Sequence, residues 1–236
     1  MSVSLEQFHA RHDFSGKGSR QEVSHLVLVV RADPIICGHS TEARNLAEAA
    51  IEMGLKSAHI VTYPLDSLKE SGLPLKPSET VSVYSDGIEV RRPEPVGDYK
   101  VLDGRLSYAL SGELVDLLRA LPGRVMVMDL YLVPHGQVVM NALASFRVLG
   151  GVPNVFSVGE AVGSDITNVV RNALMSGQTG AAQVVLANYL EHDLPVAVSE
   201  YTRDMIVASG AEVDEALGTD FASLLEEKVE VSFPAI

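Results

Sequence analysis

Short hydrophobic runs separated by amphipathic stretches recur along this chain. Residues 25–30 read HLVLVV, a continuous apolar run typical of a strand buried on both faces. Residues 43–51 carry apolar side chains at helical spacing, with Ser40 as the expected N-cap and Gly54 as the expected stop. A second apolar run follows at residues 59–63. This order predicts a strand–helix–strand unit.

The same alternation continues to the end of the chain. Further strands are expected at 125–131, 154–158, 196–198 and 229–233, and further helices at 106–121, 136–148, from 164 onward with breaks at Gly177 and Gly180, and at 200–209. We therefore predict an α/β fold. Its core is a Rossmann-like, doubly wound, mostly parallel sheet of about six strands, with helices on both faces.

Residues 64–104 differ from the rest because they are rich in proline. Within them, two β-rich runs flank Asp86 and Gly87. An Asp-Gly pair between such runs is typical of a type I′ turn, since glycine readily adopts positive φ angles. The pattern predicts a β-hairpin excursion at about 79–92, at the edge of the sheet.

Length and composition allow a full hydrophobic core, and they fit one large α/β domain or two small ones. The chain has 236 residues, of which 47% are hydrophobic. We expect residues 24–236 to form the Rossmann-like domain and residues 1–23 to form a flexible N-terminal arm. With 31 Asp and Glu against 18 Lys and Arg, the formal net charge is −13. Nucleic acid is not an expected partner, because it requires a clustered basic face.

Cysteine content and hydropathy bear on the compartment. Cys37 is the one cysteine, which excludes an internal disulfide and favours a reducing compartment. The first residues lack the apolar stretch of a secretory signal, and no apolar run approaches the roughly 18 residues that span a bilayer. We expect a cytoplasmic protein with no transmembrane segment.

Ligands of doubly wound sheets bind outside the carboxyl ends of the strands. Polar, glycine-punctuated segments follow the predicted strands there, and they supply the candidate ligand-binding residues Gly38, His39, Ser40, Thr41, Tyr131, His135, Glu160, Ser164, Asp165, Ser199, Tyr201 and Arg203. Glu160 stands out, because a carboxylate between two glycines just past a buried strand suits a hydroxylated ligand.

Each of these positions also fits a simpler role. Glycines and hydroxyl residues there can serve as turns and helix caps, and His135 can be an exposed loop histidine. The chain lacks the G-x-G-x-x-G and Walker patterns, so neither a dinucleotide nor an ATP site is indicated. Its seven histidines show no metal-ligand spacing, so neither a metal nor a cofactor is expected.

The end of the chain carries a family resemblance. Residues 196–204, VAVSEYTRD, followed by residues 229–236, VEVSFPAI, resemble the end of the amino-terminal half of retaining GT-B glycosyltransferases of group 1, or family 4. The Gly38 loop looks like the acceptor-side loop of that family, and residues 42–47 look like its first helix. The similarity extends loosely over residues 25–236.

The resemblance implies an acceptor-binding domain. In a complete enzyme of this family, a glycosyl group moves from a nucleoside-diphosphate sugar to a hydroxyl of a small-molecule or glycan acceptor, with retention. The nucleoside-diphosphate sugar is then a donor substrate and no cofactor is implied. By this resemblance Glu160 and His39 are the candidate catalytic residues, and the remaining candidates bind the acceptor.

The chain departs from the family in two respects. Many members carry a histidine after the strand that matches residues 154–158, where this chain has Glu160. The carboxyl-terminal half, with its E-x(7)-E carboxylates, has no counterpart in the sequence. The resemblance therefore implies a donor domain or subunit that this chain lacks, a hinge at its last strand, and no activity for this chain alone.

Two other functions remain open from the sequence. The chain can be a stand-alone, non-catalytic Rossmann-like binding or regulatory domain, or a subunit of a split transferase. It can also be a different small-molecule enzyme on a flavodoxin-like sheet that uses Cys37 or His39. An acceptor-side half exposes the apolar face that meets its partner, so a homo-oligomer is a further expectation.

Overall fold

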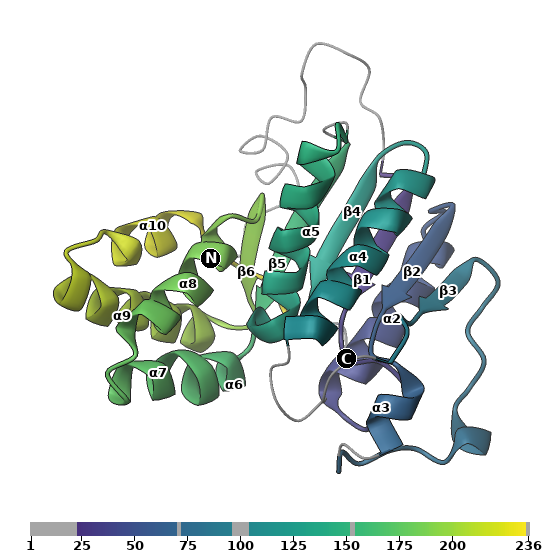
Figure 1. The fold of residues 1–236 in the computed structure, drawn as a ribbon, viewed down its shortest axis with the longest axis horizontal. Coiled ribbons are helices and arrows are strands. Elements are labelled where there is room, and N and C mark those ends of the chain that lie inside the picture. Colours follow the sequence, from purple (N-terminus) through teal and green to yellow (C-terminus); the bar gives the residue numbers. More distant parts are fainter. Residues whose placement is uncertain (1–22, 70–71, 96–103, 152–153, 235–236) are drawn as a thin grey trace.

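The computed structural model describes residues 23–69, 72–95, 104–151 and 154–234, and its ribbon is shown in Figure 1. The predicted flexible arm at 1–23 therefore lies, but for its last residue, outside the described part of the chain. The described residues form an α/β fold built on one parallel sheet of seven strands.

All seven strands run parallel, in the order β3-β2-β1-β4-β5-β6-β7. The strands are β1 (His25–Val29), β2 (Ser57–Val61), β3 (Ile88–Arg91), β4 (Val125–Asp129), β5 (Val155–Ala161), β6 (Leu194–Ala197) and β7 (Glu230–Val231). This is the Rossmann-like, doubly wound order, and the predicted fold class is confirmed.

Helices connect the strands and cover the sheet. The longer ones are α2 (Gly38–Glu52), α4 (Gly104–Ala120), α5 (Gln137–Val148), α8 (Thr179–Leu190), α9 (Glu200–Leu217) and α10 (Phe221–Lys228). Shorter pieces are α3 (Leu65–Lys69), η1 (Ser78–Thr80), α6 (Gly163–Asp165), α7 (Arg171–Met175) and two π-helical turns, η2 (Leu132–Gly136) and η3 (Ile166–Val170). In Figure 1, α4 and α5 lie in front of the central strands.

The continuous apolar run of β1 serves two hydrophobic layers. Val27 and Val29 pack with α4 and α5 on one face of the sheet. Leu26 and Leu28 pack with α2 on the other face. Successive side chains of a strand point to opposite faces, so a strand covered on both sides has no polar positions to alternate with. A third hydrophobic cluster joins α8, α9 and α10 to β6.

The strand order reverses beside β1, which lies between β2 and β4. Connections after β1 and β4 leave toward opposite faces at such a point, so the carboxyl ends of these two strands bracket a crevice. In Figure 1, α3 follows β2 and α6 follows β5, and both lie at the lower end of the sheet. That end is the carboxyl edge of the sheet.

The predicted hairpin at about 79–92 is wrong. Residues 81–85 form no strand, and β3 pairs in parallel with β2, with Ile88 opposite Ala58. Gly87 does adopt a positive φ of 93°, so the turn itself was predicted correctly. The chain then enters the main sheet because the free edge of β2 offers unpaired backbone groups, and Val90 completes the apolar layer beneath α2.

Some helix and strand boundaries differ from those expected. Helix α2 begins at Gly38 with Cys37 in the cap position, so Ser40 is not its N-cap. Strand β5 extends to Ala161, which places Glu160 inside the strand rather than after it. By contrast, Ser199 caps α9 as its spacing indicated, and its Oγ accepts a hydrogen bond of 3.1 Å from the Thr202 amide.

The far end of the chain is more helical than predicted. Helix α9 continues to Leu217, and α10 follows it as a separate helix before the short strand β7. The expected break after residue 164 falls between Met175 and Thr179, while Gly180 lies inside α8. Within the residues described, no helix is long and apolar enough to cross a membrane.

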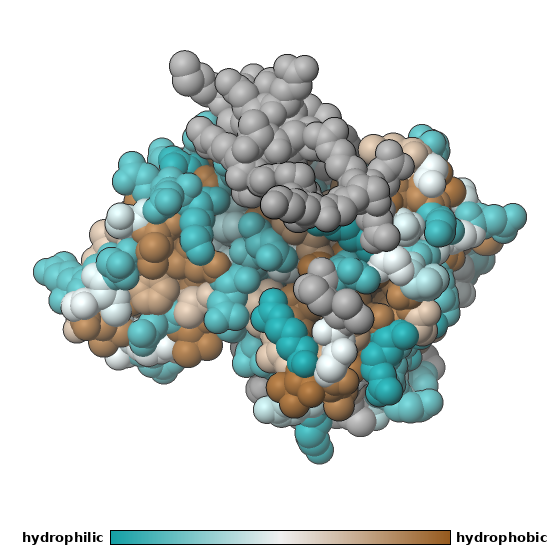
Figure 2. All heavy atoms as spheres, turned by 90° about the horizontal axis from the view of Figure 1, so that it is seen from above, coloured by the Kyte–Doolittle hydropathy of each residue, from teal (hydrophilic) through white to brown (hydrophobic). Residues whose placement is uncertain are grey.

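Exposed hydrophobic side chains are spread over several elements. Met53, Val83, Tyr108, Met175 and Phe233 are each mostly exposed and lie on different segments. From above the amino ends of the strands, the described surface is a mosaic of hydrophobic and hydrophilic residues (Figure 2). The expected self-association stays a prediction.

Candidate functional site

Buried and half-buried titratable side chains gather at the carboxyl ends of β1, β4 and β5. Arg31 and His39 follow β1, Tyr131 and His135 follow β4, and Glu160 stands near the end of β5. Parallel strands bring their carboxyl ends to one edge, so residues more than a hundred positions apart in the chain become neighbours.

An aromatic and imidazole cluster links the connections after β1 and β4. The rings of His39 and Tyr131 lie 5.2 Å apart, edge to face. The Arg31 guanidinium lies 5.1 Å from the centre of the Tyr131 ring, within the range of a cation–π contact. His135 is buried, and its Nε2 lies 3.0 Å from the Tyr63 hydroxyl. The interpretation of His135 as an exposed loop histidine is therefore wrong.

Burial keeps both imidazoles neutral near pH 7. It lowers the pKa of His135 well below its ordinary value, and electrostatic interactions with the Arg31 guanidinium and with His39 lower that pKa further. Burial also lowers the pKa of His39, and Arg31 adds to the effect. Neutral imidazoles can donate at one nitrogen and accept at the other, so they serve as hydrogen-bonding groups here.

Glu160 is the most unusual carboxyl group of the site. Its side chain is 1% exposed, and its Oε2 has no hydrogen-bond partner among the described residues. Burial raises the pKa of Glu160 to about 8, and the nearby carboxylates of Glu42, Asp129 and Asp165 contribute to the rise. Near neutral pH the group is mainly protonated, so it can donate a hydrogen bond as well as accept one.

Asp165 connects the ends of β4 and β5. It is fully buried and accepts hydrogen bonds of 3.0 Å from the Val162 amide and 3.2 Å from the Leu132 amide. Burial raises the pKa of Asp165 to about 8, although the two amides lower it. Burial raises the pKa of Tyr131 as well, and the Asp165 carboxylate adds to that rise. Asp165 thus fixes the backbone on which Tyr131 is placed.

Asp129 and His192 support the site from within the core. Asp129 Oδ2 lies 3.0 Å from His192 Nε2, and both side chains are completely buried. Gly159 makes room for the imidazole, since a Cβ atom there would lie 2.5 Å from His192 Cδ2. Burial raises the pKa of Asp129, and His192 opposes that rise. The pair joins β4 to the segment before β6.

Asp33 holds a separate, structural network after β1. It accepts hydrogen bonds from Lys76 Nζ at 2.6 Å, from Arg44 Nη2 at 2.7 Å and from Ser40 Oγ at 3.2 Å. Burial alone would raise the pKa of Asp33, but Lys76 and Arg44 outweigh it, and the pKa is lowered. Ser40 is therefore committed to Asp33, and its predicted ligand role finds no support.

Other predicted residues lie at the ends of helices. Gly38 and Thr41 are exposed at the start of α2, and Ser164 and Tyr201 are exposed at the starts of α6 and α9. Arg203 donates to the Val229 and Glu226 carbonyls at 3.0 and 2.6 Å, and so secures the end of α10. The predicted residues that come together are His39, Tyr131, His135, Glu160, Ser164 and Asp165.

Two members of the site escaped sequence reasoning. Glu42 is buried close enough to Glu160 to raise its pKa. The sequence does contain an indication of this burial, because Glu42 lies one helical turn before Leu46, on the apolar side of α2. His192 lies before the amino end of β6. The search for ligand-binding residues covered only the segments that follow the carboxyl ends of the strands, so it did not include His192. Gly159 inside an apolar strand was the only hint of a close contact.

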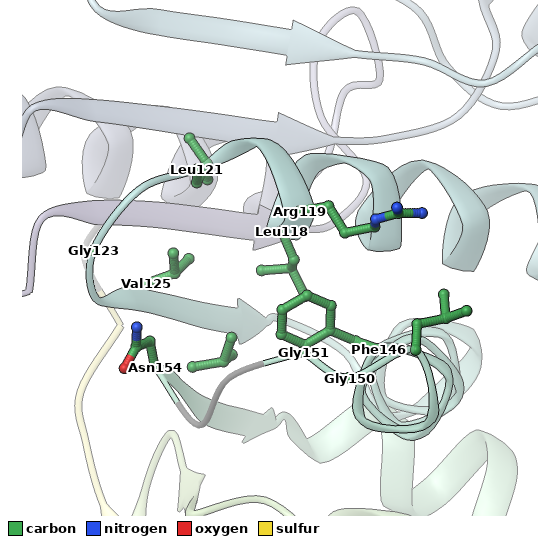
Figure 3. A pocket seen from close by; sticks show the side chains of 11 residues that line it. Leu118, Arg119, Leu121, Gly123, Val125, Phe146, Gly150, Gly151 and Asn154 are labelled. Atoms are coloured by element: carbon green, nitrogen blue, oxygen red, sulfur yellow. The ribbon is translucent and has the colours of Figure 1, made fainter.

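A pocket opens at the opposite edge of the sheet, beside the amino ends of β4 and β5. It has a volume of ≈ 270 Å³, and Phe146 lies among Leu118, Leu121 and Val125 at its wall (Figure 3). Arg119 is the single ionisable residue among its described lining residues. The pocket could hold a ligand but provides no group for acid–base chemistry. We therefore place the candidate site at the carboxyl edge of the sheet, around Glu160 and Asp165.

No metal centre is evident, because the segments that the structure describes contain no group of three or more His, Cys, Asp or Glu side chains able to hold an ion. A scan against protein-family models finds no match to this chain, and a search of curated proteins finds none either. Functional inference therefore rests on the geometry of the site.

Proposed function

We propose that this chain is the acceptor-binding half of a glycosyltransferase, an enzyme that moves a sugar from a nucleoside-diphosphate sugar to a hydroxyl group of an acceptor. One observation carries the proposal: Glu160 is buried at the carboxyl edge with a free Oε2 and a pKa of about 8. A buried polar oxygen needs a partner, and a hydroxyl group can both donate to it and accept from it.

The surrounding groups suit a polyhydroxylated ligand. His39 is partly exposed and neutral, Tyr131 presents a hydroxyl beside Ser164, and Arg31 supplies donors next to the ring. Together they provide donors and acceptors of several kinds along one edge, which is what recognition of a sugar requires. The loose resemblance of residues 196–204 and 229–236 to retaining transferases points to the same class.

In the transfer, the acceptor oxygen bonds to the anomeric carbon, and the bond from that carbon to the diphosphate breaks. The hydroxyl proton must leave as this happens. Glu160 is suited to orient the hydroxyl, and in its ionised form, which grows as pH approaches the pKa of about 8, its carboxylate accepts that proton. His39 orients the acceptor from the start of α2.

Binding to the isolated chain tests the proposal first. We expect methyl glycosides to bind at millimolar levels and to shift the NMR signals of His39 and Tyr131, while UDP-sugars and GDP-sugars bind more weakly. Tight binding of a nucleotide sugar by this chain alone would contradict the proposal. So would sugar-induced shifts confined to Phe146 and the pocket at the amino edge.

Turnover in the presence of a donor-binding half tests the roles of Glu160 and His39. Glu160→Ala should lower turnover by about 100-fold or more, as expected for a lost general acid–base group. His39→Ala should lower it by about 100-fold, as expected when the acceptor is no longer held in the reactive orientation. Glu227→Ala on the exposed side of α10 is the matched control. If the chain binds sugars but no donor half supports turnover, it is a stand-alone binding domain.

A further inference from the structure

The pocket beside the amino ends of β4 and β5 has an apolar wall. Its volume of ≈ 270 Å³ is close to the lower limit for small-molecule sites. The apolar side chains of the wall are Leu118, Leu121, Val125, Phe146, Leu149 and Val155. Arg119, Asn154 and three glycines complete the described lining. An apolar wall with a few polar groups is the usual composition of a ligand pocket.

Much of this wall is exposed apolar surface. Leu121, Phe146 and Val155 pack against the hydrophobic cluster beneath α4 and α5 but are only partly buried. Val148 and Leu149, at the end of α5, are 88% and 61% exposed. Apolar side chains gathered around a hollow favour binding, because a ligand with an apolar body removes them from water.

Two glycines set the position of the Phe146 ring. Gly150 has a φ of 79°, and the Gly151 amide donates a hydrogen bond of 2.8 Å to the Phe146 carbonyl, so the chain folds back on α5. A Cβ atom at Gly151 would lie 2.5 Å from both Cδ1 and Cε1 of the ring. The ring therefore lies against the Gly151 backbone, and it occupies the centre of the lining side chains in Figure 3.

The charge of this region is opposite to that of the chain. Between residues 117 and 155 the sequence has three arginines, Arg119, Arg124 and Arg147, and one carboxyl residue, Asp129. Asp129 is completely buried at the carboxyl end of β4, which is the other edge of the sheet. The chain as a whole has a formal net charge of −13. The end of α4, the start of β4 and the end of α5 are therefore a local basic region.

The Arg119 guanidinium is available to a ligand. Arg119 is exposed, and no carboxylate of the described residues lies within ion-pair distance of it. Asp193, which precedes the neighbouring strand β6, instead accepts hydrogen bonds of 2.8 and 3.0 Å from the amide and hydroxyl of Ser157. A guanidinium binds a carboxylate through two parallel hydrogen bonds, which an amine or a neutral sugar does not offer.

We propose that this pocket is a second ligand-binding site, which takes a small carboxylic acid with an aromatic or branched apolar body. The apolar body lies against Phe146 and Leu118, and the carboxylate meets the Arg119 guanidinium. The basic region raises the local concentration of such anions. The pocket lies at the amino edge of the sheet, across from Glu160, so this inference does not depend on the proposed function.

Ligand-observed NMR with the full chain tests the preference for a carboxylate. Phenylacetate, phenylacetamide and phenethylamine are probes of nearly equal size that differ in charge. We expect phenylacetate to bind with a dissociation constant of about 1 mM or below and about fivefold or more tighter than phenylacetamide, with phenethylamine weakest. About 0.5 M salt should reduce the preference by screening the charges. Equal binding of acid and amide, or no binding of phenylacetate, would overturn the proposal.

Protein signals locate the bound probe. Phenylacetate should shift the amide signals of Gly150 and Gly151 and the ring signals of Phe146. Shifts confined to His39 and Tyr131 would overturn this inference, whereas glycoside binding there would still support the proposed function. Gly150 and Gly151 signals that move with protein concentration, and no further on addition of phenylacetate, would show that a second copy of the chain occupies the pocket.

Two variants separate the charge of the site from its shape. Arg119→Gln should lower the affinity for phenylacetate to that for phenylacetamide and leave the latter unchanged. Gly151→Ala sets a Cβ atom against the Phe146 ring and should weaken both ligands by the same factor. Arg171→Gln, at an exposed arginine of α7, is the matched control and should change neither affinity. A preference for phenylacetate that survives in Arg119→Gln would overturn the proposal, whether or not Gly151→Ala folds.

Discussion

At the scale of single residues, burial decides the chemistry of the carboxyl groups. Glu160 and Asp165 both have a pKa raised to about 8, and desolvation is the leading cause for each. Asp33 is almost as inaccessible to solvent, yet its pKa is lowered because Lys76 and Arg44 donate directly to it. Position in the fold, more than residue type, therefore sets the charge at neutral pH.

Glu160 should make the stability of the protein depend on pH. The folded protein holds the Glu160 proton up to about pH 8, whereas the unfolded chain releases it near the ordinary value of 4.5. The unfolding free energy therefore falls as pH rises through this window. Glu160→Gln should lose less unfolding free energy than the unmodified protein as pH rises, and it should be the more stable of the two at pH 8.5. Urea unfolding of both proteins at pH 5 and pH 8.5 measures this difference in unfolding free energy.

The exposed Glu227 on α10 provides the control for this experiment. Glu227→Gln should leave the pH dependence of the unfolding free energy unchanged. Equal pH dependence in Glu160→Gln and the unmodified protein would show that Glu160 ionises in the folded state as it does in the unfolded chain.

Asp33 should show the opposite pH dependence. Asp33→Asn removes the acceptor for Lys76 and Arg44 and should cost on the order of 2 kcal/mol at pH 7. Because the pKa of Asp33 is lowered in the folded state, its contribution is present above about pH 4 and is lost as pH falls through the folded pKa. Chemical denaturation of both proteins at pH 7, 5 and 3 measures this.

Asp116→Asn, on the exposed face of α4, is the matched control for Asp33→Asn. The difference between Asp33→Asn and the unmodified protein should shrink at pH 3. A loss that stays the same from pH 7 to pH 3 would count against the ion-pair explanation.

At the scale of elements, α9 and α10 pack through a glycine. A Cβ atom at Gly210 would lie 2.7 Å from Leu225 Cδ1 and 3.0 Å from the Ala222 amide nitrogen, which belongs to the backbone of α10. Figure 1 shows the two helices side by side at the end of the sheet that carries β6. Sequence periodicity predicted the start of α9 but not this contact, because closeness between helices is not encoded in the spacing of either one.

Two helical glycines should respond in opposite ways to alanine. Gly210→Ala forces α9 and α10 apart and should destabilise the protein by about 1 kcal/mol or more. Gly112 lies inside α4 with open space around its missing Cβ, so Gly112→Ala should stabilise by about 0.5–1 kcal/mol. Thermal unfolding of both variants measures the two changes in stability. If both substitutions stabilised the protein, the close packing of α9 against α10 would be contradicted.

The edge strand shows where local patterns mislead. Asp86 and Gly87 indicated a hairpin, and the turn exists, but β3 pairs with β2 instead of with the preceding run. A turn signal reports the local backbone, whereas the strand's partner depends on which sheet edge is free nearby. The same limit explains Ser40, whose hydroxyl binds Asp33 rather than capping α2.

At the scale of the whole molecule, the two edges of the sheet have different characters. The carboxyl edge collects Glu160, Asp165 and the imidazoles of His39 and His135. The amino edge carries the pocket around Phe146 and the hydrogen-bonded side chains of His25, Ser57 and His59. The strand order reverses beside β1, which opens the carboxyl edge to a ligand.

Hydrogen exchange should therefore locate ligands at one edge. A bound glycoside should slow hydrogen exchange of the Leu132 and Val162 amides, which donate hydrogen bonds to the Asp165 carboxylate. It should also slow exchange of the amides at the start of α2. The amides of Gly150 and Gly151 beside the pocket should exchange at an unchanged rate. Protection at the pocket alone would move the binding site to the amino edge.

Periodicity in the sequence determined the α/β class, the parallel sheet and most helices, because alternating runs of buried residues report local geometry directly. Strand-end reasoning also selected Glu160 and Asp165 in advance. Only the tertiary structure placed β3 in the sheet, brought His192 to Asp129 and joined His25 to His59 through Ser57. These contacts and the raised pKa values depend on desolvation and on groups distant in the chain, which no local pattern encodes.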